Sequence, residues 1–140
     1  MTIDIYNRGM EDLDSFIKKH RKNEEKSSQF CDYLIEVMKK HGFDNDDPTV
    51  YKKANISRQN WHQIINGEVN PKLTTVIKIV FAIHANNHEC KYLLKKAGYT
   101  LASSSDYALI IRYCLENEIY DLDVVNEYLE KHGYEKNLIY

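Results

Sequence analysis

The chain has 140 residues, 43% hydrophobic and 29% charged, with a net charge of −2 and two prolines, which indicates a folded, helix-rich protein of one domain with an appendage. No apolar run reaches transmembrane length and the first residues lack an apolar signal core, so we expect a soluble protein without a membrane partner. Its three cysteines, Cys31, Cys90 and Cys114, are odd in number and widely spaced, which argues against a disulfide framework and favours a reducing, cytoplasmic location.

Residues 1–26 predict an N-terminal helical extension, with a helix from about residue 10 to residue 20. Its apolar side would carry Leu13, Phe16 and Ile17, with His20 at its end. The basic residues 18–22 that follow have two interpretations. They could form an arm that touches a nucleic-acid backbone, or a solvated helix end where cations are favoured by the dipole, and the second is preferred.

Residues 27–97 predict a second unit. Ser27 or Ser28 would cap a helix that Gly42 ends. Its buried face is expected to consist of Phe30, Leu34, Val37, Met38 and His41. The loop at 43–47 contains three acids, Asp44, Asp46 and Asp47, but lacks the twelve-residue length and terminal glutamate of a calcium-binding EF-hand.

Three short helices are predicted from residue 48 to residue 84. Asp47-Pro48 is an N-cap acid followed by proline at the first helical position, and this helix should stop at Asn55. Ser57 caps a second helix that Gly67 ends, with Trp61, Ile64 and Ile65 facing inward. Asn70-Pro71 repeats the cap-plus-proline pattern and should open a third helix from Lys72 to about His84.

A break at 85–87 precedes a predicted helix from His88 to Ala97. His84, His88 and Cys90 suggest a zinc site, but the break separates them and no fourth ligand lies nearby, so we expect no metal. Residues 98–140 predict a C-terminal helical hairpin with an acidic polar face. Its wide apolar stripes would be buried against the preceding core, or form a dimer seam; burial is preferred. They contain Tyr107, Ile110, Ile111, Cys114 and Leu115, then Leu122, Val125, Tyr128, Leu129 and His132.

The stretch from residue 48 to residue 84 resembles the helix-turn-helix of the phage-repressor and Cro type, the lambda-repressor-like (XRE) family. The residues that carry this resemblance are Val50 to Ile56, Ser57-Arg58-Gln59-Asn60, Trp61, Ile64, Gly67, Asn70-Pro71, Val76, Ile79, Val80 and Ile83. With the predicted helix from Ser28 to His41 as the first helix of the domain, the resemblance covers about 55 residues. The expected fold class is therefore all-α: a lambda-repressor-like domain with an N-terminal helix and a C-terminal hairpin.

The resemblance implies that helix 57–66 enters the major groove of double-stranded DNA, in a sequence-specific transcriptional regulator that acts as a homodimer. The expected base contacts are Arg58, Gln59, Asn60, His62 and Gln63, since Arg can pair with guanine and Gln or Asn with adenine. The expected phosphate contacts are Ser57, Lys52, Lys53, Asn66, Asn70 and Lys72. The alternative is that these polar residues are simply the solvated face of an amphipathic helix.

The distribution of charge along the sequence agrees with DNA binding. Residues 48–96 contain 8 Lys or Arg and 2 Asp or Glu, a net charge of +6, whereas residues 1–47 carry −3 and residues 97–140 carry −5. The helix-turn-helix segment is thus the only basic part, as expected of a phosphate-binding surface.

A second hypothesis is a helix-turn-helix that serves as a scaffold for protein–protein interaction, such as an antitoxin or an inhibitor of a nucleic-acid-handling protein, of phage or mobile-element origin. Three features motivate it: Tyr51, the acids of residues 43–47 and the acidic C-terminal hairpin. Tyr51 stands where the family usually has a small residue, and the acids of 43–47 would repel DNA. The acidic C-terminal hairpin would contact the protein partner. No motif of an enzyme or cofactor site is found, so we expect neither catalysis nor a cofactor.

Overall fold

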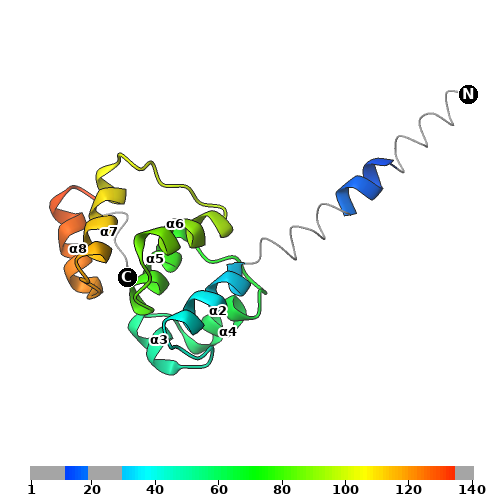
Figure 1. The fold of residues 1–140 in the computed structure, drawn as a ribbon, viewed down its shortest axis with the longest axis horizontal. Helices are drawn as coiled ribbons and strands as arrows, with labels where there is room; N and C mark the ends of the chain where they lie inside the picture. Colours follow the sequence, from blue (N-terminus) through cyan, green and yellow to red (C-terminus); the bar gives the residue numbers. More distant parts are fainter. Residues whose placement is uncertain (1–11, 19–29, 135–140) are drawn as a thin grey trace, which may run out of the picture.

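The structure is a computed structural model that describes residues 12–18 and 30–134; residues 1–11, 19–29 and 135–140 lie outside the described part. Within these ranges every regular element is an α-helix and none is a strand, which confirms the all-α class (Figure 1). After the helical residues 12–18 come α2 (Phe30–Lys40), α3 (Pro48–Lys53), α4 (Arg58–Ile65), α5 (Leu73–Ala82), α6 (Asn87–Lys96), α7 (Asp106–Glu116) and α8 (Leu122–Lys131). No helix in the described part is both long and apolar enough to cross a membrane.

Side-chain caps start several helices where the sequence predicted them. The Asp47 carboxylate accepts a hydrogen bond from the Thr49 backbone N–H at 2.9 Å, and Pro48 is the first residue of α3. Ser57 Oγ accepts from the Asn60 N–H at 3.1 Å and caps α4. These bonds satisfy backbone donors that have no partner inside the helix, so each helix starts at a defined residue.

Helix ends also follow the predicted residues. Asn55 ends α3 with a φ of +55°, and Gly67 follows α4 with a φ of +73°. Both adopt the left-handed conformation that turns the chain sharply, which asparagine tolerates and glycine adopts without steric cost. The backbone N–H of Ile56 then donates to the Tyr51 carbonyl at 2.9 Å and closes the end of α3.

The third short helix begins one residue after the predicted Lys72, but its predicted cap at Asn70 is wrong. α5 begins at Leu73 with Lys72 in the cap position, and no side chain caps it. Instead, Asn70 Nδ2 donates to the carbonyl of Ala97 at 2.9 Å, and the Tyr99 hydroxyl donates to the Pro71 carbonyl at 2.9 Å. The segment before α5 is therefore held by the end of α6, a contact that local sequence does not reveal.

Two other expectations need adjustment. α6 starts one residue before the predicted His88, because Asn86 in the supposed break is its N-cap. α2 has the expected buried residues Phe30, Leu34, Val37 and Met38, whereas His41 is partly exposed. The Ser27 or Ser28 cap, His20 and the basic residues beyond Lys18 lie outside the described residues.

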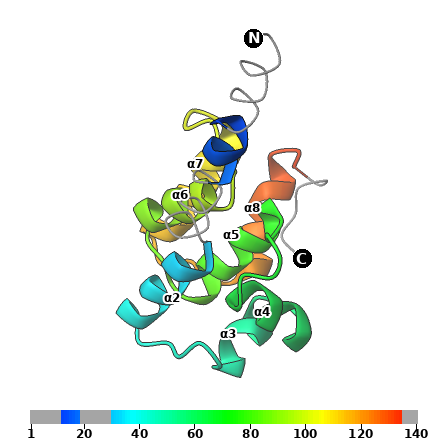
Figure 2. The same cartoon turned by 90° about the vertical axis from the view of Figure 1, so that its right-hand side faces the viewer.

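The core is centred on α5, in which every residue from Val76 to Ala82 is buried. This helix packs against α3 and α6, while α2 packs on α4 and α6. The two views place α3 and α4 together at one end of the molecule (Figures 1 and 2). α7 packs on α6 and α8, and its buried Ile111 and Cys114, with Val125 and Leu129 of α8, join the same hydrophobic cluster. One continuous core thus supports α4 and the hairpin alike.

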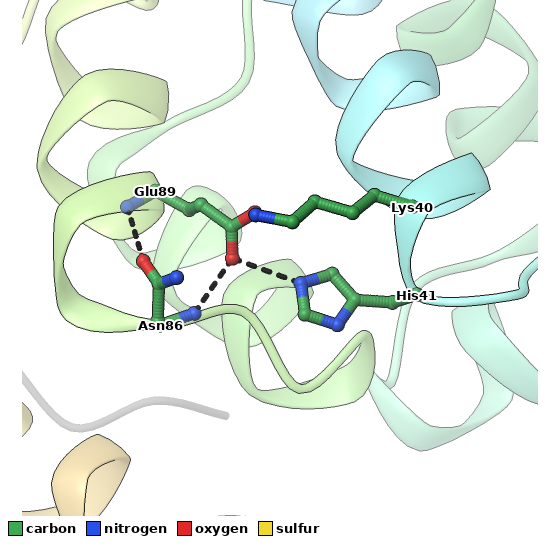
Figure 3. A network of polar contacts seen from close by, with 4 residues as sticks. All are labelled: Lys40, His41, Asn86 and Glu89. Carbon is green, nitrogen blue, oxygen red and sulfur yellow. Dashed lines mark hydrogen bonds and ion pairs between the residues drawn. The ribbon is translucent and has the colours of Figure 1, made fainter.

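A buried carboxylate joins α2 to α6 (Figure 3). Glu89 is 3% exposed, and its Oε1 accepts hydrogen bonds from His41 Nε2 at 2.8 Å and from the Asn86 backbone N–H at 2.9 Å. Its Oε2 lies 3.3 Å from Lys40 Nζ. Burial acts to raise the pKa of Glu89, but the bonds from Asn86, His41 and Lys40 outweigh it and hold the pKa below its ordinary value. These contacts fix the end of α2, which in turn supports α4.

Candidate nucleic-acid interface

The turn between α3 and α4 holds α4 at a fixed position on the core. Ala54 and Ile56 are buried on either side of the left-handed Asn55. At the far side, Trp61 of α4 is fully buried, and its Nε1–H donates to the Asn45 carbonyl at 2.9 Å. This bond ties α4 to the loop before α3, so the two helices and the loop are held together as one unit.

The Tyr51 side chain belongs to this unit. It is partly exposed, and its ring centroid lies 6.3 Å from that of Trp61. The residue that departs from the usual family pattern therefore packs between α3 and α4, and these helices still contact each other.

The outer face of α4 is polar. Arg58, Gln59 and Asn60, in its first turn, are exposed, whereas Trp61 and Ile64 are at most 1% exposed. The structure brings these three predicted base contacts together at the helix N-terminus. His62 and Gln63 are only partly exposed, so they present less of their side chains to a ligand.

The predicted phosphate contacts surround this face unevenly. Ser57 is exposed, but its hydroxyl is occupied by capping α4, and Asn66 is the exposed C-cap residue of the same helix. Lys72 is exposed at the N-cap of α5. Asn70 is exposed as well, although one of its amide hydrogens is bonded to Ala97.

Lys52 and Lys53 of α3 are exposed and line an open cleft of about 560 Å³. Asp121 and Asp123 at the start of α8 line the same cleft. Because these acids share the cleft with the two lysines, part of the positive field of the lysines is offset at this side of α3.

A histidine at the end of α5 lines the same cleft. His84 has a φ of +58°, and its ring stacks on that of Tyr120 with a centroid separation of 4.0 Å. Burial first, then the charge of Lys53, lowers the pKa of His84 below its ordinary value. This stacking joins α5 to the hairpin, which sequence reasoning did not foresee.

Folding redistributes the positive charge of residues 48–96. Lys78 is 7% exposed, and Lys91 and Lys95 lie on α6 beside a separate groove. Lys96, the last residue of α6, lines a cavity together with Glu68 and Asn70. The other four cations lie on α3, on α4 and at the start of α5: Lys52, Lys53, Arg58 and Lys72. The acids of the 43–47 loop lie next to α4 through the Trp61–Asn45 bond, and Glu68 follows α4. The positive charge at the α3–α4–α5 surface is therefore smaller than the net charge of +6 of residues 48–96 indicates.

Sequence reasoning missed Glu89 and its partners, although one signal was present. Asn86 and Glu89 stand three residues apart at the start of α6 and form a capping box, in which each side chain accepts a bond from the other's backbone. Within the described residues, no group of three or more His, Cys, Asp or Glu side chains is arranged to hold a metal ion.

Comparison with known proteins found no protein-family model, no curated protein and no solved structure that matches this chain.

Proposed function

We propose that α3 and α4 form a helix-turn-helix arranged as in the repressor-like family and that α4 reads the major groove of double-stranded DNA as part of a transcriptional regulator. The observation that carries this proposal is the division of α4: Arg58, Gln59 and Asn60 are exposed on its first turn, while Trp61 and Ile64 anchor it in the core. A firmly anchored helix can present donor and acceptor groups to base edges from a fixed backbone position.

The direct test is selection of binding sites from a random duplex library, with Gln59→Ala as the first variant. On the best site, Gln59→Ala should weaken binding by about 1–3 kcal/mol and relax discrimination at one base pair. Lys91→Ala is the matched control, since it removes an exposed side chain on α6 and should leave site preference unchanged. Equal affinity and equal preference for wild type and Gln59→Ala would refute base reading by that residue.

A second candidate is protein binding through the hairpin. It is favoured by an apolar surface on α7 and α8, which encloses an open pocket of about 510 Å³. Leu109 is 46% and Tyr113 is 54% exposed at this surface. The acids beside α4 also favour it over DNA. A stoichiometric protein complex that survives Arg58→Ala but is lost in Leu109→Asp would support this candidate. A complex lost in Arg58→Ala and kept in Leu109→Asp would count against it.

A further inference from the structure

The helical residues 12–18 present an apolar stripe bordered by acids. Leu13 is 53%, Phe16 is 61% and Ile17 is 39% exposed, and their spacing of three and four residues places them on one side of a helix. Asp12 and Asp14 are exposed and flank this stripe on its two sides, at the angles that 100° per residue gives. The helix therefore has the form of a ligand for an apolar groove with a basic rim.

A groove of that kind lies between α6 and α7. It has a volume of about 380 Å³, and its apolar lining includes Leu94, Leu101 and Ile111. Lys91 and Lys95, four residues apart on α6, border one side. Among the residues that the structure describes, neither lysine forms an ion pair, whereas Arg112 on the opposite side already pairs with Glu116 at 2.7 Å.

The chain is long enough to bring the two together. Eleven residues, 19–29, connect the helical residues 12–18 to α2, and such a connection spans up to about 36–40 Å when extended. α2 starts beside the C-terminal end of α6, because Phe30 lines a cavity together with Lys96, the last residue of that helix. A short connection also gives an effective concentration of order millimolar, which favours the chain's own groove over that of a second copy.

The geometry points to an intramolecular interaction in which the helix of residues 12–18 docks in the α6–α7 groove, with Leu13, Phe16 and Ile17 on its apolar lining and an aspartate beside Lys91 and Lys95. The other apolar surface, on α7 and α8, is a poorer match for this acidic helix, because its border contains Asp106 as well as Lys131. The interaction does not depend on the proposed DNA binding.

Amide hydrogen exchange of residues 13–17, measured in the full chain, tests this inference. Docking predicts protection of these amides, and the double variant Lys91→Glu/Lys95→Glu should lower that protection at least about tenfold. Adding Asp12→Lys/Asp14→Lys to this variant should restore most of the protection, because the helix and the border of the groove again carry opposite charges. The matched control Lys131→Glu/His132→Glu places two acids at the α7–α8 surface and should change nothing.

Three results would overturn the inference. Exchange of residues 13–17 at the rate of an unstructured peptide, both in wild type and in the Lys91→Glu/Lys95→Glu variant, would exclude docking. Loss of protection in the Lys131→Glu/His132→Glu control alone would place the helix on the hairpin instead. Protection that rises with protein concentration, together with a dimeric mass in sedimentation, would assign the helix to a second copy. All three readouts concern the helix alone, so they leave the DNA proposal untouched.

Discussion

Glu89 shows how one side chain can fix the relation between two helices. Its carboxylate is almost fully buried and accepts hydrogen bonds from His41, which follows α2, and from the backbone N–H of Asn86, the N-cap of α6. A buried carboxylate is tolerated only when such donors replace water. The partners His41 and Glu89 are 48 residues apart, so no local pattern could have predicted their contact, even though the capping box itself is visible in the sequence.

Replacing Glu89 with alanine should destabilise the protein by about 1–3 kcal/mol, because it leaves the donors of His41 and Asn86 without an acceptor. Urea denaturation measures this change. Glu127→Ala is the control: it removes an exposed ion pair with Lys131, and its effect should stay below about 0.5 kcal/mol. Equal effects of the two variants would contradict the role assigned to Glu89.

The same residue predicts a pH dependence. Because its pKa is lower in the folded than in the unfolded protein, Glu89 stabilises the fold fully above its ordinary pKa of 4.5, and this contribution is lost as pH falls toward the folded value. Stability should therefore decline on acidification below about pH 4.5 in the wild type, and less steeply in Glu89→Gln, as measured by denaturation at several pH values. An unchanged slope in Glu89→Gln would exclude this origin.

At the scale of elements, the ends of the helices were the most predictable feature. The residues that set these ends act on the backbone within three residues of themselves, so their effect can be predicted from the sequence. They are Asp47, Ser57, Asn55 and Gly67. Asn70 was misread because its amide bonds to Ala97 across the fold rather than to a neighbouring N–H. For the candidate interface, the exposure of Gln59 followed from the burial of Trp61, because the two residues lie on nearly opposite sides of α4. The position of the acids beside α4 could be seen only from the Trp61–Asn45 bond in the structure.

Ser57→Ala should destabilise the protein by about 1 kcal/mol, since it removes the oxygen that caps α4. Thermal or urea unfolding gives the magnitude. Ser104→Ala, a change at an exposed serine in the loop before α7, should have almost no effect. A Ser57→Ala protein as stable as the Ser104→Ala control would show that the cap contributes little to the position of α4.

At the scale of the whole molecule, the continuous cluster makes the hairpin part of the unit that supports α4. Buried residues of α7 and α8 belong to the same core as Trp61 and α5. The sequence left open whether the hairpin stripes would be buried or form a dimer seam, because periodicity identifies an apolar face but not what covers it. In the structure the buried residues face the core, while Leu109 and Tyr113 stay exposed.

Leu129→Ala in α8 should therefore lower the free energy of unfolding reported by Trp61 fluorescence by about 2–5 kcal/mol, even though the two residues lie on different helices. Leu109→Ala, at an exposed position of the hairpin, should change it by less than about 0.5 kcal/mol. A Trp61 transition that is insensitive to Leu129→Ala would mean that the hairpin unfolds separately from α4.

The central claim is that α4 binds duplex DNA, and the most direct measurement is titration of a selected duplex at several salt concentrations, with backbone amide shifts recorded at each step. We expect affinity to fall steeply with salt, as phosphate contacts require, and shifts to concentrate between Lys52 and Lys72. Absence of binding at low salt, or shifts confined to α7 and α8, would contradict the claim and favour a protein partner on the hairpin.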